Sequence, residues 1–268
     1  MRTKNYFFCF FGLHLGRLMC WAGRMFEHRL NEQVSRKTYF DWFILSFLAG
    51  NINAGGYLAC SRFVSHVTGF ATLAGISLEQ GSWVEAVGSL AIPLFFLIGV
   101  MVSGYLTEKK YANNIHGQRY APVMGLVALL LAFVAVGGSF GLFGQFGDVA
   151  NMKHDFFLLA CLCGACGLQN AAISSASGAT VRTTHLTGIT TDLGLGLVRA
   201  EIHNLSEAQK SIERRANWLR VATIGAFTLG SLVAAFIYSR FKYQGFFFPM
   251  FIAIYVGYVA RKSHARLR

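Results

Sequence analysis

The order of hydrophobic and polar positions divides the chain into six long uncharged stretches joined by charged connections. They cover residues 42–61, 86–107, 120–147, 156–181, 221–239 and 243–260. A helix rises about 1.5 Å per residue, so roughly 20 apolar residues cross a bilayer core. The stretches lack the alternating pattern of barrel strands, and inside hydrocarbon a helix satisfies its own backbone. Each stretch therefore predicts a transmembrane helix.

Composition strengthens this prediction. The chain is 54% hydrophobic and only 13% charged, with a mean hydropathy of +0.46. Soluble domains carry about 25% charged residues. An all-α membrane protein is expected, with the lipid bilayer as its main partner.

The distribution of basic residues predicts the topology. The net charge of +12 would favour nucleic acid in a soluble protein. With the amino terminus inside, however, nineteen Lys and Arg residues fall in cytoplasmic segments and four in outer ones. Basic residues resist translocation, so this asymmetry predicts six spans with both termini cytoplasmic. A nucleic-acid partner is not expected.

Residues 1–40 are predicted to form a cytoplasmic extension. Residues 6–22 are largely apolar, but His14 and Arg17 interrupt them and no small-residue cleavage site follows. A cleaved signal peptide is therefore not expected. An interfacial helix, an extension with little structure and a true start at Met25 stay open.

An internal repeat is the most informative feature. HVTGFATLAGISL, residues 66–78, and HLTGITTDLGLGL, residues 185–197, are identical at six of thirteen positions. Upstream, Asn53 and Asn170 each precede an alanine. The two copies predict three-helix repeats, 41–147 and 148–268, each with a short T-G motif. Three spans is an odd number, so the second repeat would enter the membrane in the opposite sense, as in many secondary transporters.

Residues 51–78 and 167–197 resemble the YoaK family of bacterial membrane proteins, whose function is not established. The resemblance runs from about residue 30 to the carboxyl end and implies a multi-pass protein of the bacterial cytoplasmic (inner) membrane. Family members often carry aspartate where Asn53 stands and asparagine where Phe70 stands. If the family uses that carboxylate for proton coupling, this chain departs from it.

Four amide side chains lie within the predicted spans: Asn51, Asn53, Gln169 and Asn170. Polar groups in a span usually face the bundle interior or a cavity. The four amides are therefore candidates for a solute site between the two halves. The alternative is plain interhelical hydrogen bonding, worth about 0.6–2 kcal/mol per bond.

The T-G motifs are too short to cross a membrane. A re-entrant or broken helix lining a cavity is one interpretation. An interfacial helix is the other. The motif residues assigned to the candidate site are His66, Thr68, Gly69, Thr72, Thr184, His185, Thr187, Gly188, Thr191 and Asp192. The histidines would sense protons or simply lie at the interface. Asp192 would bind a cation or proton, or pair with Arg182 or Arg199.

No cofactor or metal is expected, and no catalytic residues are assigned. Cys163 and Cys166 share a helix face, which would suit a soft metal or a redox pair, but thiols also pack as small apolar groups. The chain lacks catalytic motifs such as H-E-x-x-H and G-x-S-x-G. An enzyme is not expected.

The sequence therefore favours a small-solute transporter or permease that works by alternating access. The alternative is a non-transporting scaffold or sensor. It would bind a partner through residues 199–217, predicted to form a cytoplasmic amphipathic helix capped by Ser206. The identity of the solute and the presence of a homo-oligomer stay open.

Overall fold

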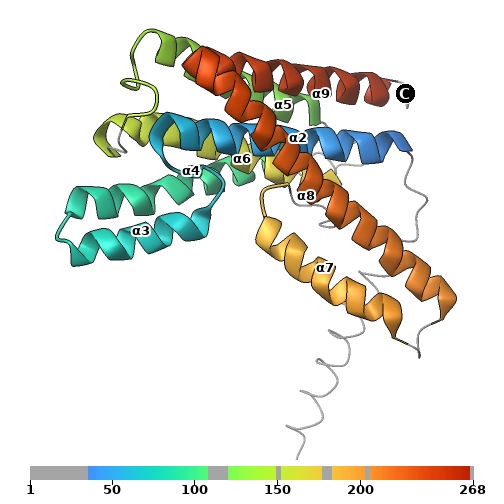
Figure 1. The fold of residues 1–268 in the computed structure, drawn as a ribbon. Helices are drawn as coiled ribbons and strands as arrows, with labels where there is room; N and C mark the ends of the chain where they lie inside the picture. Colours follow the sequence, from blue (N-terminus) through green and yellow to red (C-terminus); the bar gives the residue numbers. More distant parts are fainter. Residues whose placement is uncertain (1–35, 108–119, 149–151, 177–182, 203–205, 266–268) are drawn as a thin grey trace, which may run out of the picture.

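The computed structural model describes residues 36–107, 120–148, 152–176, 183–202 and 206–265, and within these ranges the regular structure is entirely helical (Figure 1). The helices are α2 (Arg36–Cys60), α3 (Val67–Glu79), α4 (Trp83–Thr107), α5 (Tyr120–Ser139), α6 (Met152–Ala176), α7 (Leu186–Glu201), α8 (Glu207–Phe241), η1 (Lys242–Phe246) and α9 (Phe247–Ala265). The predicted all-helical class is confirmed. The predicted extension lies largely outside the described residues.

Five stretches of the described chain are long and apolar enough to cross a membrane. They are Trp42–Cys60, Trp83–Thr107, Tyr120–Ser139, Asp155–Ser175 and Glu207–Arg261. The last is 55 residues long and contains α8, η1 and α9. These are the features of an integral membrane protein. The count of six crossings stays a prediction, because the last stretch holds two helices in one continuous apolar segment.

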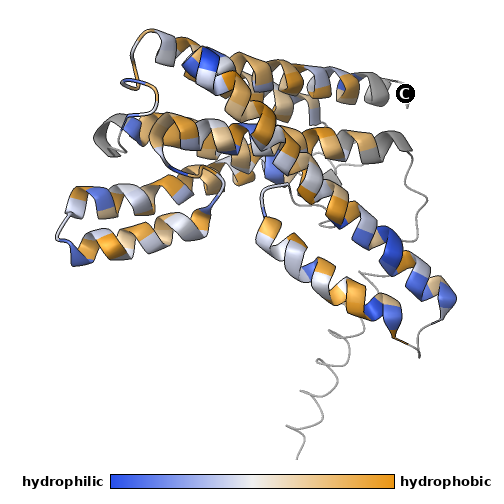
Figure 2. Ribbon diagram, in the orientation of Figure 1, coloured by the Kyte–Doolittle hydropathy of each residue, from blue (hydrophilic) through white to orange (hydrophobic). Residues whose placement is uncertain are grey.

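One face of α4 shows why the helices need a lipid environment. Its large side chains at three- and four-residue intervals lie outside the bundle, each more than half exposed: Val87, Leu90, Leu94, Leu97 and Met101. In water such a continuous apolar stripe would be a liability, whereas in a membrane it faces acyl chains. Figure 2 shows hydrophilic residues gathered where α3 meets α4 and where α7 meets α8.

Two predicted boundaries are wrong. The stretch 120–147 does not stay helical to its end, because α5 stops at Ser139 and a turn with positive φ at Gly141, Gly144 and Gly147 follows. That backbone region favours glycine. The last span also starts late, since residues 243–246 belong to the 3-10 turn η1 rather than to α9.

The predicted surface helix over residues 199–217 is also wrong. Arg199 lies in the last turn of α7. Glu207 begins a separate helix, α8, which continues without a break to Phe241. The predicted cap at Ser206 is confirmed, because its Oγ accepts a hydrogen bond from the backbone N–H of Gln209 at 3.3 Å. The polar segment is continuous with a membrane-length helix.

The helices pair across the two halves of the chain. In the first half α3 packs along α4, and in the second half α7 packs along α8. The main partner of α4 is α6, whereas the main partner of α8 is α2, and α5 packs against α9. Figure 1 shows the α3–α4 and α7–α8 hairpins extending to opposite sides of the central helices.

Glycines bring α2 and α8 into backbone contact. A Cβ atom on Gly50 would lie 2.0 Å from the carbonyl oxygen of Phe227, and one on Gly230 would lie 2.0 Å from that of Phe47. No side chain fits at either distance. Small residues at such crossings allow the close approach that stabilises helix pairs in membranes.

The same arrangement recurs between α6 and α4. A Cβ on Gly167 would lie 2.1 Å from the carbonyl oxygen of Phe96, and one on Gly99 would lie 2.3 Å from that of Gly164. The sequence interval from Gly50 to Gly167 equals that from Asn53 to Asn170. The two crossings therefore use corresponding positions of the two halves.

Candidate functional site

Asn51 connects α2 to α8. Its side chain is fully buried, and its Nδ2 donates to the carbonyl oxygen of Gly230 at 3.3 Å. The hydroxyl of Tyr238 donates to Asn51 Oδ1 at 3.2 Å. Both ends of this amide are satisfied by the helix that crosses α2, as interhelical packing requires.

Gln169 connects α6 to α2. Its Nε2 donates to the carbonyl oxygen of Leu45, whereas its Oε1 is buried without a partner among the described residues. Asn51 and Gln169 thus bind different helices. The hydrogen bonds of the described residues do not join the predicted amides to one another.

Asn53 faces the connection between α2 and α3. Its Oδ1 accepts two hydrogen bonds from Ser65, one from the backbone N–H at 3.2 Å and one from the hydroxyl at 2.9 Å. Both side chains are buried. This pair fixes the segment that leads into the first T-G motif.

The corresponding place in the second half has no such pair. Asn170 Oδ1 and the hydroxyls of Thr183 and Thr184 are buried, and none has a hydrogen-bond partner in the described part of the chain. Thr184 and Ser65 each come directly before the histidine of a T-G motif. These three oxygen atoms are therefore buried without the hydrogen bonds that buried polar groups usually make.

The T-G motifs form α3 and α7, and their repeated residues face outward. Thr72 and Thr191 are exposed, and each hydroxyl donates to the carbonyl oxygen four residues earlier, at 3.1 Å and 3.0 Å. The acceptors belong to Thr68 and Thr187, which are exposed too. The motif threonines therefore do not face the buried amides.

The two motif glycines differ in their surroundings. A Cβ on Gly69 would meet only the Cβ of His66, at 3.6 Å, whereas one on Gly188 would meet nothing within 4 Å. Within this chain, neither glycine provides a notch for a closely packed neighbour. Both positions leave room for a neighbour outside it.

The remaining predicted groups are also exposed. His66 and His185 are the N-terminal flanking residues of α3 and α7. Asp192 lies on the exposed face of α7, and Arg199 pairs with Glu213 at 3.8 Å. The suggested partner Arg182 lies outside the described residues.

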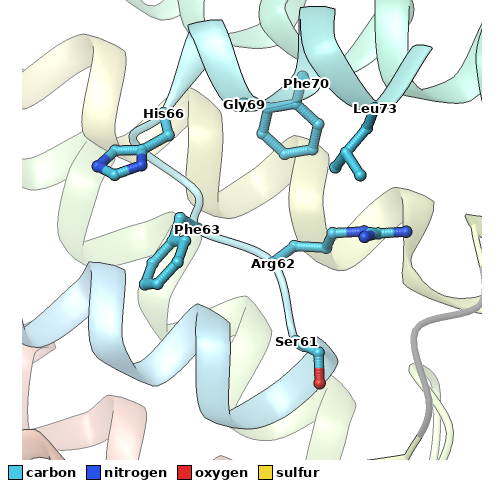
Figure 3. A pocket seen from close by; sticks show the side chains of 7 residues that line it. All are labelled: Ser61, Arg62, Phe63, His66, Gly69, Phe70 and Leu73. Atoms are coloured by element: carbon cyan, nitrogen blue, oxygen red, sulfur yellow. The ribbon is translucent and has the colours of Figure 1, made fainter. Parts of the chain in front are cut away.

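A cavity of about 230 Å³ opens at the start of α3. It is lined by Ser61, Arg62, Phe63, His66, Gly69, Phe70 and Leu73. Figure 3 shows Arg62 running alongside Phe70 and Leu73, with His66 next to Phe63 on the other side. Two of the predicted site residues, His66 and Gly69, therefore do line a cavity.

Aromatic packing and one ion pair shape this cavity. Phe63 stacks on Tyr57 with ring centroids 4.5 Å apart and lies 5.1 Å from the ring of His66. The guanidinium of Arg62 lies 4.0 Å from the carboxylate of Glu85, and the arginine side chain is 22% exposed. A long ion pair at this exposure contributes little to stability, so Arg62 can contact a polar solute.

The cysteines follow the packing interpretation. Cys163 and Cys166 are buried, and the Cys163 thiol donates to the carbonyl oxygen of Val64 at 2.9 Å. The described residues contain no group of three or more His, Cys, Asp or Glu side chains suited to a metal ion. The thiol of Cys163 instead connects α6 to the segment before α3.

Arg62, Ser65, Thr183 and Tyr238 take part in these arrangements without having been predicted. A signal existed for Ser65 and Thr183. When the two motifs are aligned, Val64-Ser65-His66 corresponds to Thr183-Thr184-His185, so the second copy carries an additional hydroxyl. Tyr238 gave no such signal, because its partner Asn51 is distant in sequence.

A family model described as "Protein of unknown function (DUF1275)" matches residues 42–259. No curated protein and no solved structure matches the chain. The matched range runs from within α2 to within α9 and includes both T-G motifs. The family match agrees with the extent of the predicted resemblance, and the name YoaK stays a prediction.

Proposed function

The chain belongs to the DUF1275 family, and we propose that it is a small-solute permease of a bacterial cytoplasmic membrane. In this proposal six crossings form two three-helix repeats of opposite orientation, with both termini cytoplasmic. Alternating access results from rocking one repeat against the other. Transporters built in this way place their sites between the repeats.

The matched helix crossings carry the proposal. The second helix of membrane length in each half packs on the first helix of the other half, α4 on α6 and α8 on α2. Gly99 and Gly230 occupy corresponding positions in these crossings, as do Gly50 and Gly167. An exchange of partners between halves is expected of a two-fold related pair. It supports the inverted repeat more directly than sequence identity does.

The cavity at the start of α3 supports a small polar solute. Its volume of about 230 Å³ is below the roughly 300–1,000 Å³ of pockets for drug-sized ligands. Arg62 supplies a charged donor, and Phe63 and Phe70 supply apolar walls. We place one solute contact here, on the side of the membrane that α3 faces. A solute with a carboxylate or phosphate group suits this lining.

The scaffold hypothesis has less support. The segment assigned to a partner pairs with itself, since Glu213 lies 3.8 Å from Arg199 and 3.5 Å from Arg220. Asn217 accepts a hydrogen bond from Arg220 at 2.6 Å. Of these contacts, the Arg199–Glu213 pair joins α7 to α8, and both contacts of Arg220 lie within α8.

Thiol labelling tests the opposed orientation. Glu79 and Glu201 are the exposed last residues of α3 and α7, so single cysteines there report on the carboxyl ends of the two motif helices. In a background free of the native cysteines, an impermeant maleimide should label Glu79→Cys on intact cells. Glu201→Cys should react only after permeabilisation. Labelling of both positions from the same side would overturn the inverted repeat.

A flux measurement tests transport itself. Proteoliposomes are exposed to a mixture of organic acids, amino acids, sugar phosphates and sugars, and the lumen is analysed by mass spectrometry. At least one anionic solute should accumulate above protein-free liposomes. Arg62→Gln should reduce its entry roughly tenfold, as expected when a charge-assisted bond is lost. The matched control Arg240→Gln alters an exposed arginine outside the cavity and should leave entry unchanged. Equal exclusion of every solute would overturn the permease.

A further inference from the structure

In the second half of the chain, four buried oxygen atoms have no hydrogen-bond partner among the described residues. They are Gln169 Oε1, Asn170 Oδ1, Thr183 Oγ1 and Thr184 Oγ1. The residues are 0%, 7%, 0% and 4% exposed, respectively. Leaving a buried polar group unpaired costs about 1–3 kcal/mol, so four together call for an explanation.

The four residues form two pairs of sequence neighbours, and the first half of the chain indicates how such pairs lie. Gln169 and Asn170 are neighbours on α6, and Thr183 and Thr184 are neighbours just before His185. In the first half, the residue corresponding to Asn170 reaches the residue corresponding to Thr184 directly. That contact is the 2.9 Å bond between Asn53 Oδ1 and Ser65 Oγ.

The orientation of Gln169 is fixed by its other end. Its Nε2 donates to the carbonyl oxygen of Leu45 on α2, so the amide oxygen must point away from that contact. A buried oxygen held in place in this way has little freedom to find another partner.

The chemistry of the four atoms selects the ligand. Two are amide oxygens and two are hydroxyl oxygens, which are hard ligands without formal charge. Divalent cations are usually held by carboxylates, and transition metals by histidine or thiolate. The described residues contain no group of three or more such side chains. Monovalent cations, in contrast, are coordinated by neutral oxygens in channels and sodium-coupled transporters.

We propose that Gln169, Asn170, Thr183 and Thr184 bind a monovalent alkali cation, with sodium as the first ion to test. Each residue supplies one oxygen, and the cation satisfies all four. The two hydroxyls direct their lone pairs at the ion and their hydrogens elsewhere. Binding itself is independent of transport, whereas a role as the coupling ion rests on the proposed permease.

Thermal unfolding of the purified full-length protein in detergent tests the site. Melting is followed in NaCl, KCl and choline chloride at equal ionic strength. A ligand that binds only the folded state raises the midpoint with concentration. We expect Tm to rise by several degrees in sodium relative to choline, and the rise to saturate.

Variants place the effect at the proposed atoms. Thr183→Val and Asn170→Leu remove one oxygen each with little change in volume. Both should abolish the sodium shift while keeping the midpoint in choline. The matched controls are Ser65→Ala, in the corresponding place of the first half, and Thr191→Val, on the exposed face of α7. Both should keep the shift, although Ser65→Ala should lower every midpoint.

Equal midpoints in all three salts would overturn the site, and the oxygens would then hold water. A sodium shift that survives Thr183→Val and Asn170→Leu would also overturn it, because the ion would bind elsewhere. A similar shift in potassium would support an alkali-cation site of low selectivity. A sodium shift without solute accumulation in proteoliposomes would leave the site standing and overturn the permease.

Discussion

The two connections that lead into α3 and α7 use the same plan and reach different results. Before α3, the Asn53 amide accepts two hydrogen bonds from Ser65. Before α7, Oδ1 of the corresponding Asn170 and the hydroxyl of Thr184 are buried with no partner among the described residues. The connection before α3 is held by hydrogen bonds between Asn53 and Ser65, whereas the connection before α7 has oxygens that are unpaired in the described part of the chain.

The helix crossings do not diverge in this way. Each crossing depends on glycine because a backbone carbonyl occupies the space of a side chain, and no other residue fits. A polar pair, in contrast, can lose its bond if a ligand or water satisfies the atoms instead. The comparison indicates that packing restrains both halves equally, whereas the polar pair before the motif helix differs between them.

The largest expected effect comes from filling a crossing. Gly50→Ala would place a methyl group 2.0 Å from the carbonyl oxygen of Phe227. We expect the free energy of unfolding, measured by SDS titration, to fall by about 3 kcal/mol, at the upper end of ordinary overpacking. Gly167→Ala, in the corresponding position, should cost about as much.

The control for these variants is Gly225→Ala on α8, where an added Cβ meets nothing within 4 Å. It should be neutral or stabilise the protein by up to about 1 kcal/mol, because alanine favours a helix. If Gly167→Ala behaves like the control while Gly50→Ala does not, the two crossings are not equivalent. The two halves would then not share the same close helix packing.

A smaller effect distinguishes the two asparagines. Asn53→Leu leaves the N–H and hydroxyl of Ser65 buried without their acceptor. The expected loss in the free energy of unfolding is about 2 kcal/mol. Asn170→Leu removes a buried oxygen that has no partner among the described residues, so it should be close to neutral when alkali cations are absent. The measurement is SDS titration in choline chloride, and equal losses for both variants would show that Asn170 is bonded after all.

The helices were predictable from the sequence because membrane spans depend on a running excess of apolar residues, which needs no tertiary information. The cap at Ser206 was also predictable, because it depends only on residues next to it in the sequence. The direction of Asn51 was not, because it depends on how α2 is rotated against α8. That rotation is determined by Gly50 and Gly230, which touch residues far away in the chain.

The candidate site was predictable only in part. Asn170 and Thr184 were assigned to it from the repeat, and His66 and Gly69 line a cavity. From the sequence, all four amides were expected to line one site, whereas Asn51 and Gln169 form hydrogen bonds to different helices. Thr183 was missed because a hydroxyl before a helix looks like an ordinary cap, and only burial shows otherwise.

A still smaller effect concerns a bond that exists in one half only. Tyr238→Phe removes the hydroxyl that donates to Asn51 Oδ1 at 3.2 Å. The expected loss in the free energy of unfolding is about 1 kcal/mol by SDS titration. The exposed Tyr255 serves as a control, because Tyr255→Phe should change nothing.

The corresponding residue in the first half is Thr107, which lies as far after Gly99 as Tyr238 lies after Gly230. Its hydroxyl donates to the carbonyl oxygen of Ser103 in its own helix at 2.8 Å. Thr107→Val should therefore cost less than about 0.5 kcal/mol, since that carbonyl keeps its helical partner. A loss as large as that of Tyr238→Phe would mean that Thr107 also binds across a crossing. The asymmetry between the halves would then be confined to Asn170 and its two threonines.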